Sequence, residues 1–295
     1  MSFRVIAIGI LGLLCFHSGA NTICLSRGFV PPVKPMDEKT APEAMRLWEQ
    51  AIEAKGGRER LHAVRNLVIT SHGVYFSGTM KKNKIRKEIL YALPDKLWGW
   101  IDLRPGVFGL SVTMYNLTTQ MKYAITDTDP NHYLEPLTAN DKRDISISMS
   151  LLSYLPETKW WKPELVTSSS GRLGLKPVDI VQTQIDGKRV DFALDRKSHL
   201  PVRITTYTVD KNGASIDTID LLDYVDIDGI KMPATFKYDD GTVYKQTYQL
   251  NVNYNENIFL KPPSIESGPE VWKLATNVRV ACYTAPPSFS FTCSF

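Results

Sequence analysis

IKMPATFKYDDGTVYKQTYQLNVNY, residues 230–254, decides the fold because apolar and polar residues alternate on both sides of one short turn. The apolar or aromatic even positions are Met232, Ala234, Phe236, Tyr238, Tyr244, Tyr248, Leu250, Val252 and Tyr254. The even positions before the turn and those after it share one face only if the loop has an odd number of residues, as in a type I turn with Gly241 in a left-handed bulge position. The stretch predicts an antiparallel hairpin whose aromatic face is buried and whose odd positions, such as Lys245 and Gln249, face water.

The same pattern continues upstream through the second half of the chain. Strands are predicted at about 178–185, 188–195, 201–209, 215–225, 230–239 and 242–254, with compact turns at Asp186-Gly187, 196–199, 211–213, Asp228-Gly229 and 239–241. In FALDRKSHLPVRITTY, residues 192–207, Phe192 and Leu194 share a parity with Val202 and Ile204. This half predicts an antiparallel meander with one apolar face.

The first half begins with a predicted helix and continues as strands. TAPEAMRLWEQAIEAKGG, residues 40–57, has a capping box at Thr40 and Glu43 and an apolar stripe, and a helical turn follows over 58–64. Strands are predicted at 67–76, 84–93, 95–103 and 118–125, with turns at Lys82-Asn83, Pro94-Asp95 and 104–106. Trp98 and Trp100 share one face of their strand, and Leu97, Ile101 and Leu103 share the other, so this strand is expected to be covered on both sides.

Two middle segments connect the halves. Residues 141–157 fit both a strand and a helix, and the acidic first turn and Pro156 favour a helix. Residues 156–177 are rich in proline and serine and are expected to be a long connection, either a domain boundary or a loop that crosses one end of a single sheet. The fold predicted from these segments is α+β: a large curved antiparallel sheet, or half-open barrel, with an N-terminal helix and a mid-chain lid segment on its concave face.

Composition and the termini indicate an exported globular protein. The chain has 295 residues, of which 43% are hydrophobic and 22% charged, and its net charge of +4 does not indicate nucleic-acid binding. Residues 1–20 resemble a cleaved signal peptide, residues 21–39 form a proline-rich leader, and no later window has the roughly 20 apolar residues of a membrane helix. We therefore expect a periplasmic location.

The cysteines predict one disulfide at the C-terminal end. Neither Cys15 nor Cys24 follows a small residue, so a lipid anchor is not expected. Cleavage after Ala20 leaves Cys24, Cys282 and Cys293. Cys282 with Cys293 closes the shortest loop and is the favoured pair, and pairs with Cys24 remain the alternative.

The run KKNKIRK, residues 81–87, concentrates positive charge. Its basic residues are Lys81, Lys82, Lys84, Arg86 and Lys87. One interpretation is a solvated turn leading into an edge strand, where lysines prevent pairing between sheets. The other is a contact surface for a membrane with anionic lipid head groups.

The corner from Leu194 to Arg203, LDRKSHLPVR, and the return DGIKMP at 228–233 resemble the LolA/LolB-like superfamily of periplasmic lipoprotein carriers, in particular the outer-membrane lipoprotein-sorting proteins. The resemblance covers about residues 40–265, as a single carrier-like domain, and the C-terminal tail 266–295 departs from it. It implies a barrel that binds acyl chains under a helical lid, without a cofactor.

No sequence feature indicates catalysis. There is no G-x-S-x-G, phosphate loop or dinucleotide motif, and His62, His72, His132 and His199 lack metal-ligand spacing. DTDPNH, residues 127–132, is interpreted as a turn rather than a calcium site. We therefore expect no enzyme, no metal and no catalytic residue.

Aromatic residues of the sheet are the candidate ligand contacts. The candidates for lining a cavity are Trp98, Trp100, Phe236, Tyr244, Tyr248 and Tyr254, although sheet aromatics also serve as plain core. The pair Trp160-Trp161 is predicted to lie in a loop, at a membrane interface or at the rim of the cavity. The sequence thus favours an exported carrier or sensor for an acyl chain, lipid or lipoprotein; the alternative is a non-catalytic envelope scaffold with a fully packed sheet.

Overall fold

The computed structural model of the chain describes residues 41–77, 81–104, 109–126, 134–138, 154–185, 187–210, 213–260 and 268–273. Several sequence predictions lie outside these residues. They are the signal peptide 1–20, the leader 21–39, the turn 127–132, residues 141–153 of the predicted lid segment 141–155, and the disulfide between Cys282 and Cys293.

The described part of the chain contains two α-helices, thirteen strands and short 3-10 turns. The elements are α1 (Ala41–Lys55), α2 (Arg58–Ala63), β1 (Asn66–Ser77), β2 (Lys81–Ala92), β3 (Lys96–Asp102), β4 (Leu110–Asn116), β5 (Met121–Thr126), β6 (Glu135–Pro136), β7 (Glu164–Leu173), β8 (Lys176–Ile185), β9 (Lys188–Asp195), β10 (Pro201–Asp210), β11 (Gly213–Ile227), β12 (Ile230–Tyr238), β13 (Val243–Leu250), η1 (Glu256–Phe259) and η3 (Pro269–Trp272). No helix in the described ranges is long and apolar enough to cross a membrane.

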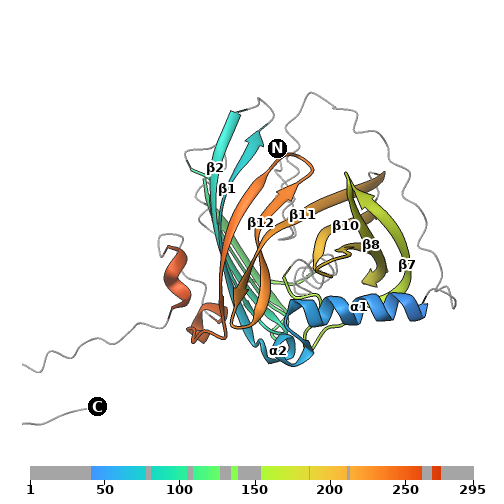
Figure 1. The fold of residues 1–295 in the computed structure, drawn as a ribbon. Coiled ribbons are helices and arrows are strands. Elements are labelled where there is room, and N and C mark those ends of the chain that lie inside the picture. The colour runs from blue at the N-terminus through green and yellow to red at the C-terminus, as the bar shows by residue number, and fades with distance from the viewer. Residues whose placement is uncertain are drawn as a thin grey trace, which may run out of the picture.

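All strands belong to one open antiparallel sheet in the order β6-β5-β4-β3-β2-β1-β13-β12-β11-β10-β9-β8-β7. Two meanders are therefore joined where the first strand, β1, pairs with the last, β13. We call β1 to β6 the first wing and β7 to β13 the second wing. The sheet curves around α1, which lies across its lower end in Figure 1. The predicted curved antiparallel α+β fold is confirmed.

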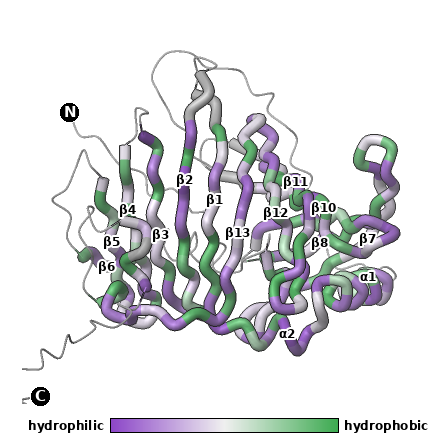
Figure 2. Tube along the Cα trace, turned by 60° about the vertical axis from the view of Figure 1, so that its left-hand side comes forward, coloured by the Kyte–Doolittle hydropathy of each residue, from purple (hydrophilic) through white to green (hydrophobic). Residues whose placement is uncertain are grey.

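The hairpin predicted at 230–254 forms as far as Leu250, where β13 ends. Asn251 then has φ 52°, and Val252 and Tyr254 pack on the opposite face of the sheet from Phe236, so their predicted place on its face is wrong. Phe236 pairs with Tyr244, and the backbone N–H of Tyr238 donates to the carbonyl of Thr242 at 2.9 Å, leaving Asp239, Asp240 and Gly241 as a three-residue loop. Gly241 has φ 83°, a conformation that suits glycine. The odd loop keeps Phe236 and Tyr244 on one face, and Figure 2 shows apolar and polar residues alternating along the neighbouring strands.

The hairpin at 192–207 differs from the prediction at one residue. Phe192, Leu194 and Ile204 are buried on one face, but the pairing shifts between Pro201 and Arg203. Val202 is the extra residue of this β-bulge and is only partly buried. The bulge changes the parity after Pro201, which simple alternation does not predict.

The predicted connection over 156–177 is wrong in its second half. Residues Glu164–Leu173 form β7, which pairs with β8 along its length. β7 is an edge strand, and an edge strand tolerates a serine-rich sequence because little of its surface needs to be buried.

Two details of the first wing also differ. Lys82 and Asn83 lie within β2, paired with Phe76 and Tyr75, and not in a turn. A separate strand, β4, precedes a turn at 117–120, and β5 then begins at Met121. β2 lies between β1 and β3, so the interpretation of the basic run as an edge strand is wrong.

The helix α1 forms with the predicted apolar stripe. Ala44, Leu47, Trp48, Ala51 and Ile52 are buried, and the helix packs on β7, β8 and β12. Gly56, at φ 126°, ends the helix; a Cβ there would lie 2.2 Å from the carbonyl oxygen of Gly229. Only glycine permits this close approach to the β11–β12 turn.

Candidate functional site: the inner face of the sheet

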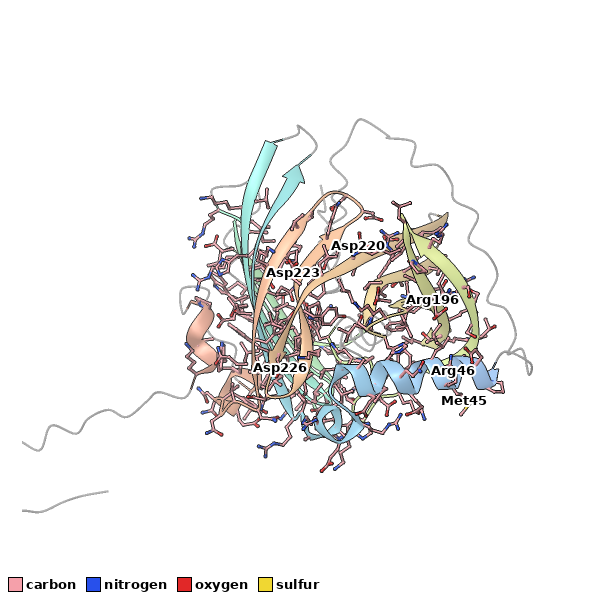
Figure 3. The ribbon with its side chains drawn as sticks, in the orientation of Figure 1. Met45, Arg46, Arg196, Asp220, Asp223 and Asp226 are labelled. Carbon is pink, nitrogen blue, oxygen red and sulfur yellow. The ribbon has the colours of Figure 1, made fainter. Side chains whose placement is uncertain are left out.

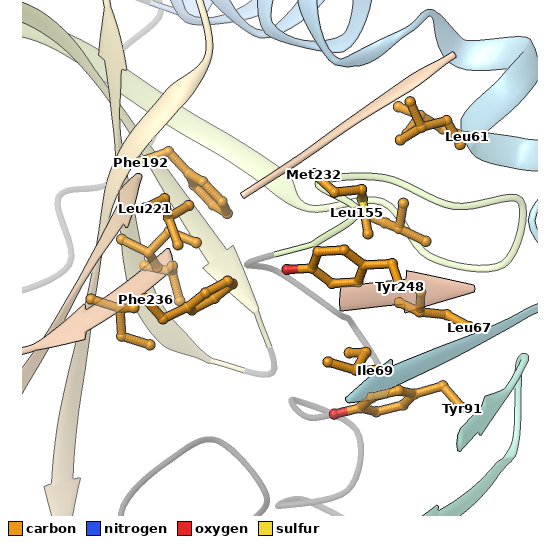
Figure 4. Close-up of a cluster of buried hydrophobic side chains, with 14 of the residues drawn as sticks. Leu61, Leu67, Ile69, Tyr91, Leu155, Phe192, Leu221, Met232, Phe236 and Tyr248 are labelled. Atoms are coloured by element: carbon orange, nitrogen blue, oxygen red, sulfur yellow. The ribbon is translucent and has the colours of Figure 1, made fainter. Parts of the chain in front are cut away.

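Alternation along the strands divides the core into two clusters on opposite faces of the sheet. The inner face is the side covered by α1, and the outer face is the side covered by η1 and η3. On β1, Leu67 and Ile69 belong to the inner cluster and Val68 to the outer one. Figure 4 shows part of the inner cluster, including Leu67, Ile69, Tyr91, Phe192, Phe236 and Tyr248. Residues of both wings therefore meet on the inner face.

The six cavity candidates divide between these faces. Phe236, Tyr244 and Tyr248 belong to the inner cluster. Trp98 and Trp100 are buried in the outer cluster, and Tyr254 packs against it with its ring 6.0 Å from that of Phe259. The predicted two-sided cover of β3 is present because Leu97 and Leu103 lie in the inner cluster. The structure therefore places only half of the six candidates on one surface.

Aromatic rings gather at the centre of the inner face. The ring of Tyr154 lies 5.2 Å from Phe236 and 5.9 Å from Tyr248, and Tyr238 lies 5.5 Å from Tyr244. The hydroxyl of Tyr248 donates to the carbonyl of Pro233 and contacts Oε1 of Gln246 at 2.8 Å. Burial raises the pKa of Tyr154, Tyr244 and Tyr248 above the ordinary value, so these phenols stay neutral.

A lysine lies buried at the helical end of this face. The side chain of Lys55, in the last turn of α1, is 1% exposed, and its Nζ lies 5.2 Å from the centre of the Tyr224 ring. No hydrogen bond or ion pair joins it to the described residues. Burial lowers the pKa of Lys55 to about 7. The Tyr224 hydroxyl donates to the carbonyl of Pro201 at 2.6 Å, so the ring face, not the oxygen, meets the lysine.

A second lysine lies on the inner face between the wings. Lys87 follows Ile85 and precedes Ile89 on the odd side of β2, and both isoleucines belong to the inner cluster. Its Nζ lies 4.4 Å from the centre of the Tyr244 ring. Burial lowers the pKa of Lys87 to about 8, and the charge of Asp240 opposes this effect.

A buried ion cluster attaches the segment before β7 to α2. Glu157, 2% exposed, accepts from Nε of Arg58 at 2.8 Å and contacts Nε2 of His62 at 2.9 Å. Burial by itself raises the pKa of Glu157, but the hydrogen bonds from Arg58 and His62 outweigh it and hold the pKa below its ordinary value. Tyr154, three residues earlier, is thereby held against Phe236 and Tyr248.

The basic run of β2 divides between the two faces. Lys87 points inward, whereas Lys84 and Arg86 line a groove of about 530 Å³ on the outer face. The groove is lined by His72, Gly73, Val74, Lys84, Ile85, Arg86, Asp102, Arg104, Val243 and Lys245. Lys81 and Lys82 pair with Ser77 and Phe76 in the β1–β2 hairpin.

Charges on the outer face are partly neutralised by neighbours. In the groove, Arg104 contacts Asp102 at 2.9 Å, and Arg86 lies over the Trp100 ring at 5.5 Å. Three aspartates along β11, labelled in Figure 3, are each paired. Asp220 contacts Arg203, Asp223 contacts Lys245 and Asp226 contacts Lys231. The described ranges contain no group of three or more His, Cys, Asp or Glu that could hold a metal.

The remaining sequence candidates have separate surroundings. His62 belongs to the Glu157 cluster, His72 lines the outer groove, and His199 lies at a turn where its N–H donates to the carbonyl of Asp195 at 2.7 Å. Trp160 is 42% exposed in a turn beside the half-buried Trp161.

Sequence reasoning missed Lys55 and Glu157 and placed Lys87 only on the surface. Lys55 follows Ala51 and Ile52 by four and three residues, so it continues the apolar stripe of α1. Lys87 alternates with Ile85 and Ile89, which marks the inner side of β2. Glu157 has no local signal because its partners Arg58 and His62 lie 99 and 95 residues away.

No family model matches the sequence, and no curated protein matches it. The fold is similar to solved structures of the LolA-like and lipoprotein-sorting group, at low identity. A putative outer membrane lipoprotein-sorting protein domain from Vibrio parahaemolyticus is 11% identical, with TM-score 0.45 and coverage of 74% of this chain and 97% of that one. A LolA superfamily protein from Nitrosomonas europaea is 13% identical, with TM-score 0.46 and coverage of 75% and 98%. A DUF1329 family protein from Desulfovibrio piger is 11% identical, with TM-score 0.47 and coverage of 73% and 96%. The likeness concerns the fold alone.

Proposed function

We propose that this protein is an exported, non-catalytic carrier or sensor that binds an acyl chain, of a lipid or a lipoprotein, on the inner face of its sheet. The observation that carries the proposal is the inner cluster itself. It is one apolar, aromatic layer shared by both wings of an open sheet, and it includes Tyr91, Phe192, Phe236 and Tyr248. An acyl chain needs such a surface, since burying each CH2 group contributes about 0.8 kcal/mol.

The outer cluster differs from the inner one and is the less suitable surface for an acyl chain. It is closed by Ile258, Phe259 and Trp272 from the segments after β13. Two lysines that have no carboxylate partner among the described residues, Lys55 and Lys87, lie on the inner face instead. A purely structural layer has no need of such cations, because an unpaired buried charge is destabilising.

The first test is native mass spectrometry of the protein purified from the exported fraction, followed by organic extraction and lipid identification. A co-purifying acyl species, or a mass gain on incubation with phospholipid or acylated peptide, is the expected result. A bare mass with no gain contradicts the proposal and favours a scaffold whose sheet is fully packed.

Two neighbouring residues of β2 provide matched variants for the same test. Ile89 belongs to the inner cluster and Leu90 to the outer one. Ile89→Gln is expected to reduce lipid uptake per folded molecule, whereas Leu90→Gln is expected to lower stability without changing uptake. Equal uptake by folded Ile89→Gln and the wild type would place the ligand elsewhere.

We propose, as a second function of the surface, that the outer groove contacts membranes with anionic head groups. Its lining includes Lys84, Arg86, Arg104 and Lys245 against one carboxylate, that of Asp102. The apolar side chains of Val74 and Val243 complete the lining. Each basic residue near an anionic membrane surface contributes about 1 kcal/mol.

Vesicle sedimentation tests this contact. Binding to vesicles that contain phosphatidylglycerol is expected to exceed binding to phosphatidylcholine vesicles and to fall with salt. The double change Lys84→Gln with Arg86→Gln is expected to remove this preference. The control, Lys197→Gln with Lys237→Gln, removes the same charge from exposed positions outside the groove. Equal losses in both double variants would show that net charge alone acts.

A further inference from the structure

A polar row crosses the inner face between apolar rows. Ser71 on β1 pairs with Lys87 on β2 and with Gln246 on β13. Ser71 and Gln246 are buried. The rows on either side are apolar or aromatic: Ile69 pairs with Ile89 and Tyr248, and Gly73 pairs with Ile85 and Tyr244. Three hydrogen-bonding side chains thus lie in register inside an apolar layer.

The ring of Tyr244, in the row next to Ser71 and Gln246, positions the ammonium of Lys87. A Cβ at Gly73 would lie 2.6 Å from Cδ1 of Tyr244, so only glycine lets this ring rest on β1. The ring in turn contacts Lys87, at 4.4 Å from Nζ. Lys87 makes no ion pair with the described residues, and the acid whose charge acts on it, Asp240, lies in the exposed β12–β13 turn. The positive charge is held in place without a close carboxylate.

Lys55 differs from Lys87 in access and in neighbours. Lys55 is enclosed between α1 and the ring of Tyr224, whose hydroxyl already bonds the backbone. Lys87 keeps part of its surface exposed and has the hydroxyl of Ser71 and the amide of Gln246 in the same row. A ligand oxyanion can therefore obtain several donors at Lys87 but not at Lys55.

We infer that Lys87, with Ser71 and Gln246, holds the anionic head group of an amphiphile whose acyl chain lies on the inner face. The inference rests on the proposed carrier function and narrows its ligand to acyl chains that end in an oxyanion. The oxyanion is a carboxylate or a phosphate, and both accept charge-assisted hydrogen bonds from an ammonium. A neutral head group can accept a hydrogen bond but carries no opposite charge, so it leaves Lys87 without a counterion.

Competition for a neutral fluorescent probe, N-phenyl-1-naphthylamine, tests the inference. The full exported chain is titrated at pH 7 with palmitate, 1-palmitoyl lysophosphatidate and the neutral ester monopalmitin, below their aggregation concentrations. We expect the wild type to bind at least one anionic amphiphile about tenfold more tightly than monopalmitin. Preference for palmitate assigns a carboxylate, and preference for lysophosphatidate assigns a phosphate.

Variants separate the half-buried Lys87 from the buried Lys55. Lys87→Met is expected to lose the preference while monopalmitin affinity stays within about twofold, and Lys87→Arg, which keeps the charge, is expected to retain it. Lys55→Met, the matched control, also removes one buried cation over a tyrosine ring and is expected to retain the preference. If Lys87→Met does not fold, Lys87→Gln and Ser71→Ala report on the same row.

The outcomes distinguish the two levels of the proposal. A wild type that binds none of the three amphiphiles contradicts the carrier function. A wild type that binds monopalmitin as tightly as the anionic amphiphiles overturns the head-group assignment alone. Equal loss of preference in Lys55→Met and Lys87→Met also overturns it, since overall charge would then explain the effect.

Discussion

The two faces of the sheet are formed by the same strands but differ in how they are covered and in which polar side chains they contain. On the outer face, Trp98 and Trp100 pack under Phe259 and Trp272 and form a closed core. On the inner face, the apolar layer includes tyrosines and is interrupted by Lys87, and Lys55 approaches it from α1. The comparison teaches that apolar area alone does not mark a site. What distinguishes the inner face is two lysines without a carboxylate partner among the described residues, the buried Lys55 and the half-buried Lys87.

The largest loss of stability is expected from creating a cavity in the outer cluster. Trp272 is buried, and its indole N–H donates to the buried Glu88. Trp272→Ala should lower the free energy of unfolding by about 3–5 kcal/mol, because it leaves a large cavity, without changing lipid uptake by the folded protein. Urea denaturation measures the first quantity and probe binding the second.

Trp160→Ala is the control for this change, since Trp160 is partly exposed in a turn and should cost about 0.5 kcal/mol or less. Loss of uptake in folded Trp272→Ala would break the distinction between a structural outer face and a binding inner face.

The buried Lys55 predicts a pH-dependent effect on stability. Unlike the loss of Trp272, its replacement should stabilise the protein at low pH. The pKa of Lys55 is lowered to about 7 in the folded state from an ordinary 10.5, so the unfolded chain binds more protons between these values. Wild-type stability should therefore rise with pH by up to about 1.4 kcal/mol per unit from pH 7 to 10 relative to Lys55→Met. The variant should be the more stable at pH 6, and the difference should shrink by about 4 kcal/mol towards pH 10.

Unfolding of both proteins by urea at pH 6, 8 and 10 measures this difference. A gap that stays constant with pH would show that Lys55 remains charged when buried, and the inner face would then carry a permanent cation at its helical end.

Breaking the ion cluster of Glu157, Arg58 and His62 should cause a smaller loss of stability. Glu157→Gln removes the charge that pairs with Arg58 and His62 and should cost about 2 kcal/mol at pH 7, since Arg58 is partly exposed and can be hydrated. The pKa of Glu157 is below its ordinary 4.5, so this stabilisation is present above pH 4.5 and is lost as the pH falls through the folded pKa.

The measurement is the difference in urea unfolding midpoint between wild type and Glu157→Gln, followed from pH 7 downwards; the two midpoints should converge once the pH is below the folded pKa of Glu157. Lipid uptake should also weaken in the variant, because Tyr154 depends on this attachment for its position. Unchanged uptake would separate the ion cluster from the inner site.

The smallest effect is expected from one hydroxyl group. Tyr248→Phe removes the hydrogen bond to the carbonyl of Pro233 and the contact with Gln246, and should cost about 1 kcal/mol. Its apolar surface is kept, so uptake of a neutral acyl ester should not fall. A calorimetric scan and probe competition are the measurements; a loss of neutral binding would assign the hydroxyl, not the ring, to the ligand.

Much of this architecture follows from local sequence. Alternation in residues 230–250, with Gly241 at the turn, determines a hairpin with one aromatic face, because successive side chains of a strand point to opposite sides. The stripe from Ala44 to Ile52 determines α1 in the same way. The separate faces of Trp98 and Leu97 are likewise set by parity within one strand.

The tertiary structure decided which face each strand turns inward and which distant residues meet. Pairing of β1 with β13 joins residues nearly two hundred positions apart and puts Ser71 between Lys87 and Gln246. The bulge at Val202 and the burial of Glu157 beside Arg58 depend on such partners. Periodicity specifies that a strand has two faces, but only packing against the rest of the chain decides which face becomes a closed core and which receives an unpaired lysine.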